Sequence, residues 1–119
     1  MATNYVQPGN TLTLTAPSGG VVAGKLYIIN NVAVVALTSA SAGAEFEGAI
    51  TGVFDLPKAP SQAWNQGARI MWDNTVNQRA SNATTAGFFP IGVAVRAVGD
   101  GAGEIVGRVR LNGVATVAL

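Results

Sequence analysis

The sequence contains no cysteine, and it has no histidine either. Without cysteine the chain cannot form a disulfide scaffold, bind a metal through thiolates or use a thiol as a nucleophile. Without histidine it lacks the most common general base and the most common ligand for transition metals. These absences exclude much of enzymology, and we expect a protein that is not an enzyme, with no catalytic, cofactor or metal site.

Charged residues are scarce, at 11% of the chain, and the formal net charge is only +1. Proteins that bind the phosphates of nucleic acid carry clustered lysine and arginine side chains. The seven cationic residues of this chain are instead scattered between Lys25 and Arg110. We therefore expect no nucleic-acid partner.

Long apolar runs are also missing. The longest lies at residues 32–37, and a membrane-spanning helix requires ~20 such residues. The first residues show neither the basic nor the apolar region of a signal peptide, so we expect no membrane partner. The mean hydropathy is nevertheless +0.35. Either alanine, valine and glycine raise the index of an ordinary surface, or apolar surface is kept for a partner.

Apolar and polar residues alternate with a period of two along most of the chain. The alternation is clearest at residues 11–15, 68–73, 91–97 and 105–111. It is typical of half-buried strands, and turn signals rich in glycine and proline separate the runs. The pattern predicts an all-β fold, a small antiparallel β-barrel or sandwich with an extended N-terminal segment.

The length of 119 residues predicts a single β domain over residues 1–119, in which residues 1–10 could form an N-terminal arm. No long window shows the 3.6-residue period of a helix. We expect at most one short helical turn, near residues 61–66, where Pro60 and Ser61 could begin it and Gly67 could end it.

The alternation also assigns faces to the expected strands. Ile70 and Trp72 are predicted to face inward, with Arg69, Met71 and Asp73 on the outer side. Inward positions are also predicted at Ile91, Val93, Val95, Ala97, Ile105, Val109 and Leu111.

Residues 64–80 hold both tryptophans and are predicted to form a hairpin that turns at Asp73 and Asn74. In that interpretation Trp72 fills the core and Trp64 covers the edge of the strand that it precedes. The alternative is a site that stacks a base or a sugar on these rings.

Residues 19–25 nearly spell the phosphate-binding pattern G-x-x-x-x-G-K. That loop needs serine or threonine after the lysine and must open a helix. Here Leu26 follows Lys25, and the next residues resemble a strand, so we expect no nucleotide site.

Glu45 and Glu47 would lie on one side of a strand, about 7 Å apart. Inverting glycosidases use carboxylates at a similar separation, but spacing alone is a weak signal. Arg108 and Arg110 have the same spacing, so ion pairing across strands or between subunits is the simpler use.

Three segments, at residues 2–29, 47–73 and 90–113, together resemble a known family. In order and spacing they are similar to the capsid-cement, or head-decoration, family of tailed phages, long catalogued as a domain of unknown function. The matching positions are Tyr5, Pro8, Gly9, Gly52–Lys58, Trp64, Gly67, Trp72, Asp73, Ile91–Ala94 and Gly107–Asn112. Two features depart from the family pattern: the pair Phe88-Phe89 and the apolar tail at residues 113–119.

The resemblance implies a structural virion protein that binds the outside of a phage head and stabilises it. Its partners would be the major capsid protein and itself, as a homotrimer, after assembly in the host bacterial cytoplasm. The alternatives are another minor head or tail structural protein, or a carbohydrate-binding β module that uses Trp64 and Trp72.

Three groups of residues are candidates for the interfaces of such a protein. The first is the arm at residues 2–7, with Asn4, Tyr5, Val6 and Gln7, which could instead be an edge strand or a loose terminus. The second is Phe88 and Phe89, which could instead both lie in the core. The third is the pair Arg108 and Arg110.

Overall fold

The computed structural model describes residues 8–75 and 77–119 and confirms the predicted all-β class. That part of the chain contains no helix. Where at most one short helical turn was expected, near residues 61–66, the chain instead forms two turns on either side of a bridge at Trp64. The strands are β1 (Thr11–Thr15), β2 (Leu26–Ile29), β3 (Val32–Ala36), β4 (Glu45–Ala49), β5 (Thr51–Pro57), β6 (Arg69–Asp73), β7 (Arg79–Ser81), β8 (Phe89–Ala94) and β9 (Val106–Asn112).

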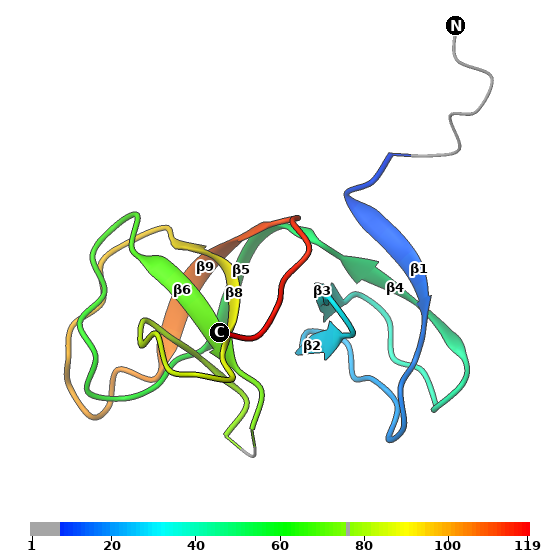
Figure 1. The fold of residues 1–119 in the computed structure, drawn as a ribbon, viewed down its shortest axis with the longest axis horizontal. Helices are drawn as coiled ribbons and strands as arrows, with labels where there is room; N and C mark the ends of the chain where they lie inside the picture. Colours follow the sequence, from blue (N-terminus) through cyan, green and yellow to red (C-terminus); the bar gives the residue numbers. More distant parts are fainter. Residues whose placement is uncertain (1–7, 76) are drawn as a thin grey trace, which may run out of the picture.

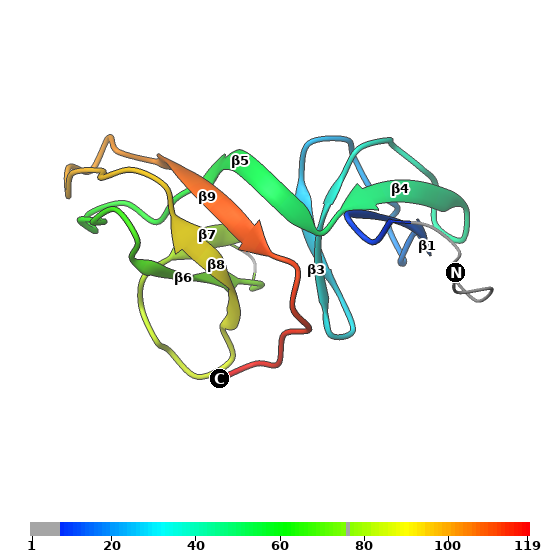
Figure 2. The ribbon, with the colours of Figure 1, turned by 90° about the horizontal axis from the view of Figure 1, so that it is seen from above.

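The strands form two antiparallel sheets that lie beside each other (Figure 1). One is four-stranded, in the order β1-β4-β3-β2, and the other is five-stranded, in the order β5-β9-β8-β6-β7. Only Ile50 separates β4 from β5, so the chain passes almost straight from the first sheet into the second (Figure 2).

The five-stranded sheet curls into a half-barrel whose first and last strands meet at one end. Directly after β5, Lys58 forms a parallel bridge with Ala80 of β7. The amide of Ala59 donates to the carbonyl of Ala80 at 2.8 Å. The predicted small antiparallel barrel or sandwich is therefore confirmed in the form of one sheet curled into a half-barrel, with a second sheet beside it.

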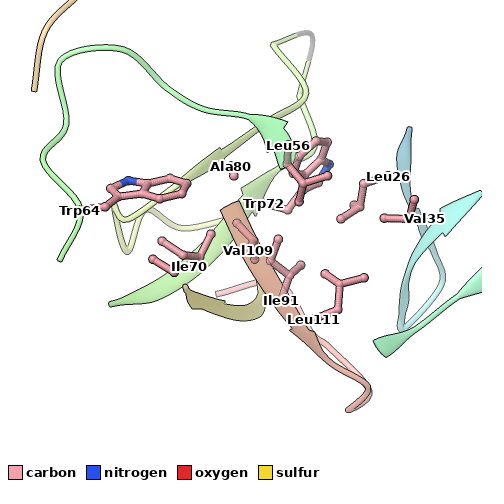
Figure 3. Packing of buried hydrophobic residues seen from close by; sticks show 11 residues of the cluster. Leu26, Val35, Leu56, Trp64, Ile70, Trp72, Ala80, Ile91, Val109 and Leu111 are labelled. Carbon is pink, nitrogen blue, oxygen red and sulfur yellow. The ribbon is translucent and has the colours of Figure 1, made fainter. Parts of the chain in front are cut away.

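One hydrophobic cluster is shared by the two sheets (Figure 3). Leu26 and Val35 come from the four-stranded sheet, and the remaining members come from the half-barrel and the segment that precedes β6. In the view of Figure 3, Leu26 and Val35 lie on the side of Trp72 and Leu111. A second cluster, around Val34 and Phe46, belongs to the four-stranded sheet alone.

The C-terminal tail adds a polar link between the sheets. The amide of Thr116 donates to the carbonyl of Asn31, in the β2–β3 turn, and the Asn31 side chain donates back to the Thr116 carbonyl. The Thr116 hydroxyl donates to the carbonyl of Pro90 in β8. Residues 113–119 thus tie the half-barrel to the neighbouring hairpin.

The predicted faces are correct where pairing is regular. Leu12 and Leu14 of β1 are half-buried between exposed threonines. Val109 and Leu111 of β9 are buried, whereas Arg110 is exposed. Ile105 was expected to face inward, but it lies in the loop before β9 and is exposed.

The predicted faces are only partly correct in β6 and β8, where a β-bulge interrupts the pairing: Ile70, Trp72 and Ile91 are buried as predicted. Ile70 is opposite Gly92 and Met71 is opposite Pro90, so Ile91 is an extra residue in β8. A bulge shifts the alternation by one, which leaves Ile91 and Gly92 both buried and turns Val93 outward. Met71 and Asp73 are also buried, contrary to the prediction.

Replacement of Leu26 by alanine tests whether the shared cluster makes the chain one domain. Leu26→Ala should lower the free energy of unfolding by about 2–4 kcal/mol, because it leaves a cavity in a packed core. Tryptophan fluorescence, which reports on the half-barrel, and far-UV circular dichroism, which reports on both sheets, should show the same shift in denaturant.

Val53→Ala serves as the control, since Val53 is exposed and its truncation should change stability by less than about 0.5 kcal/mol. Two separate transitions, or a Leu26→Ala shift seen by only one probe, would contradict the single-domain prediction.

Candidate interaction surfaces

Both tryptophan rings lie inside the molecule. Trp64 is 1% exposed and Trp72 is 2% exposed. The Trp64 ring lies on the backbone of Gly107, where an added Cβ would come within 2.2 Å of the ring. Trp72 fills the core as predicted, whereas Trp64 belongs to the core itself instead of covering an edge. Neither ring has a face open to a base or a sugar, which argues against the carbohydrate alternative.

Lys58 is buried at the point where the half-barrel closes. Its ammonium group donates to the carbonyls of Ala59 at 3.0 Å and Glu104 at 3.2 Å. It also lies 5.5 Å from the centroid of the Trp64 ring, within the range of a cation–π contact. Burial lowers the pKa of Lys58, although the carboxylates of Glu104 and Asp100 oppose the shift.

Asp73 is buried at the end of β6 and organises the turn that follows. It accepts hydrogen bonds from the amide and hydroxyl of Thr75 and from the side chain of Asn77. Burial alone would raise the pKa of Asp73, but these hydrogen bonds and the charge of Arg79 outweigh it and hold that pKa below its ordinary value. Asp73 therefore has a structural role in the predicted turn.

The segment at residues 19–25 gives no phosphate-binding loop. Lys25 is followed by β2 instead of a helix, as the sequence predicted. Among residues 8–75 and 77–119, no three acidic side chains lie close enough together to hold a metal ion.

Arg108 forms an ion pair with Asp55, the residue directly opposite it on β5. The Arg108 Nε and Nη2 atoms lie 3.0 and 3.3 Å from the two carboxylate oxygens. The hydrogen bond from Arg108 lowers the pKa of Asp55, and the same bond raises the pKa of Arg108. Asp55 was not predicted as the partner of Arg108. It lies two residues after Val53, so alternation along the strand places both side chains on the same face of the sheet.

Glu45 and Glu47 lie on β4 of the other sheet and are both exposed. Glu47 accepts a hydrogen bond of 2.6 Å from the hydroxyl of Thr13, which is opposite it on β1. The two carboxylates do share one side of a strand as predicted. They do not pair with Arg108 within the chain.

A comparison with protein families identifies the class of protein. The sequence matches the family described as phage cement protein over residues 6–111. This chain belongs to the phage cement protein family. No curated protein and no solved structure matches it.

The two features that depart from the cement-family pattern contact each other. The amide of Leu119, at the end of the tail, donates to the carbonyl of Phe88, and the amide of Gly87 donates to the carbonyl of Leu119. Phe88 and Phe89 are both half-buried, and Phe89 packs against the shared cluster. Phe89 is thus partly core, and whether either ring contacts a partner stays a prediction.

The other predicted interface residues of this cement protein fall into two groups. Arg110 is exposed on β9 and stands between Val53 and Val93 on the neighbouring strands. Asn4, Tyr5, Val6 and Gln7 lie outside the described residues. The described part also has no helix long and apolar enough to cross a membrane.

Apolar side chains are exposed at several places on the surface. They are Val22, Leu37, Val53, Val93, Ile105, Val106, Val114, Val117 and Leu119. These residues explain part of the high mean hydropathy. Because exposed apolar surface often marks contact sites, these residues favour the explanation that apolar surface is kept for a partner.

The pH dependence of stability tests the buried state of Lys58. Its pKa is lower in the folded chain than the ordinary value of 10.5. Between those two pKa values the unfolded chain binds more protons, so stability rises with pH. The free energy of unfolding of the wild type, measured relative to Lys58→Met, should therefore increase as the pH approaches 10.5.

Denaturant unfolding of both proteins from neutral to alkaline pH measures this difference, and subtraction cancels the groups that they share. A difference that stays flat would show that burial does not lower the pKa of Lys58, and one that decreases with pH would show that the folded chain favours the charged ammonium.

Proposed function

We propose that this chain binds the outer surface of an assembled phage head and stabilises it against the pressure of the packaged DNA. The family match over residues 6–111 carries the proposal. Its main partner is the major capsid protein, and it acts on the exterior of a virion assembled in the host bacterial cytoplasm. The ionisable and aromatic residues that a catalytic or binding site would use support a structural role instead. Lys58 and Asp73 form hydrogen bonds inside the chain, and Trp64 packs in its core.

We further propose that the protein works as a homotrimer with several contacts to the shell. Binding at many sites at once raises the effective affinity without strong individual contacts. This suits a chain of low charge whose exposed ion pair, Arg108–Asp55, contributes little by itself. The predicted arm at residues 2–7 would supply one contact by pairing with a neighbouring chain or with the capsid protein.

Co-sedimentation with heads tests the proposed function. Purified protein is mixed with expanded, undecorated heads of its own phage, and the bound copies are counted. We expect saturation at hundreds of copies, in a multiple of the number of three-fold sites. A dozen copies or fewer would indicate a minor head or tail protein, and no binding to authentic expanded heads would contradict the proposal.

The same assay separates the arm from the β body. A chain without residues 2–7 should bind heads more weakly while it keeps the circular dichroism spectrum of the full chain. Thr84→Ala, at an exposed residue of the loop between β7 and β8, serves as the control. Unchanged binding after the deletion would show that the arm makes no contact with the shell.

A further inference from the structure

The outer face of the half-barrel carries a row of alternating valine and arginine side chains. Val53 of β5 is opposite Arg110 of β9, Arg110 is opposite Val93 of β8, and Val93 is opposite Arg69 of β6. Residues directly opposite each other in antiparallel strands point to the same side of the sheet. These four residues, here called the arginine row, therefore cross four strands on one surface.

The arginine row is exposed and its charge is uncompensated. Val53 is 52% exposed and Val93 is 39% exposed. Among the described residues, no carboxylate forms a salt bridge with Arg69 or Arg110. Asp55, on the same face, pairs with Arg108. A hollow of about 180 Å³ lies along the row between Arg69 and Arg110.

The four-stranded sheet presents a face of opposite charge. Glu47 of β4 lies between Thr13 of β1 and Leu37, the residue that directly follows β3. The Leu37 amide donates to the Glu47 carbonyl. Glu45 projects on the same side, two residues earlier. Leu37 is 46% exposed. Glu45, Glu47, Leu37 and Thr13, here called the glutamate face, thus combine two carboxylates with one apolar side chain.

We propose that the arginine row of one copy docks on the glutamate face of a second copy. The arginine row offers two positive charges beside two valines, and the glutamate face offers two negative charges beside Leu37. Glu45 and Glu47 are about 7 Å apart along a strand, whereas Arg69 and Arg110 are two strands apart, about 10 Å. The long arginine side chains span this difference and can each meet one carboxylate. Glu47 keeps free acceptor positions beside its bond to Thr13.

This contact joins different surfaces of the two copies. In a pair of copies, one keeps a free glutamate face and the other keeps a free arginine row, so the same contact repeats head to tail and ends where a ring closes. The inference rests on the self-association in the proposed function and names the surfaces that make it. The valines and Leu37 contribute apolar burial, while the charges select the partner and the register.

Sedimentation velocity of the full chain without heads, at increasing protein concentration, tests the proposal. The wild type should self-associate, less so in about 0.5 M salt than at low salt. The pairs Arg69→Glu with Arg110→Glu, and Glu45→Lys with Glu47→Lys, should each weaken association at least about tenfold, because like charges then face each other. A chain with all four substitutions should recover it, because the signs are opposite again.

Arg110→Glu alone should also weaken association, and Lys25→Glu is its matched control: it makes the same change in net charge at an exposed residue that belongs to neither surface, and it should leave association unchanged. Circular dichroism checks the fold of each variant, and Arg69→Gln with Arg110→Gln replaces the reversed pair if that pair misfolds.

A wild type that stays monomeric, or reversed pairs that associate like the wild type, would overturn the proposal. So would arginine variants that lose head binding while self-association is intact, because the row would then contact the shell. Head binding by the wild type is scored separately, so a monomer that decorates heads refutes only the self-contact. A self-associating protein that ignores heads refutes only the cement role.

Discussion

The hydrophobic cluster between the two sheets is the contact on which the rest of the structure depends. Leu26 and Val35 belong to a sheet whose other buried residues form their own small cluster, and they enter the core of the half-barrel instead. Apolar burial is non-directional and would allow the sheets to rotate against each other. The hydrogen bonds of Thr116 to Asn31 and Pro90 restrict that rotation. The arginine row and the glutamate face lie on different sheets, so in the proposed self-contact this junction would also set the angle between successive copies.

The division between interior and surface explains how a chain with so little chemistry can act as a cement. Buried polar groups such as Lys58 and Asp73 find their partners within the chain. Together with the Trp64–Gly107 contact they make the half-barrel rigid. Exposed valines and arginines lie on the outer face of the half-barrel, and other exposed apolar side chains lie in loops and in the C-terminal tail. In the proposed function, a body with two complementary faces would place weak contacts at fixed distances, and repetition over a shell would turn them into strong attachment.

The sequence predicts the parts of this fold that depend on local pattern. Leu12 and Leu14, the hairpin around Asp73, and the inward side of Val109 and Leu111 follow from alternation and turn chemistry. The bulge at Ile91 depends on how β8 pairs with β6, and no local pattern reports that pairing. The burial of Lys58 likewise depends on the closure of β5 against β7. Among the candidate interface residues, spacing suggested ion pairs for Arg108 and Arg110, but the partner of Arg108 and the position of Val93 opposite Arg110 depend on the strand register.

An electron cryomicroscopy map of heads saturated with the purified protein tests the central claim most directly. The account predicts density for the β body at repeated positions on the outside of the shell, in contact with the major capsid protein. In that density the outer face of the half-barrel of one copy meets β4 of the next. Density confined to the portal or tail vertex, or none on the shell, would contradict the account.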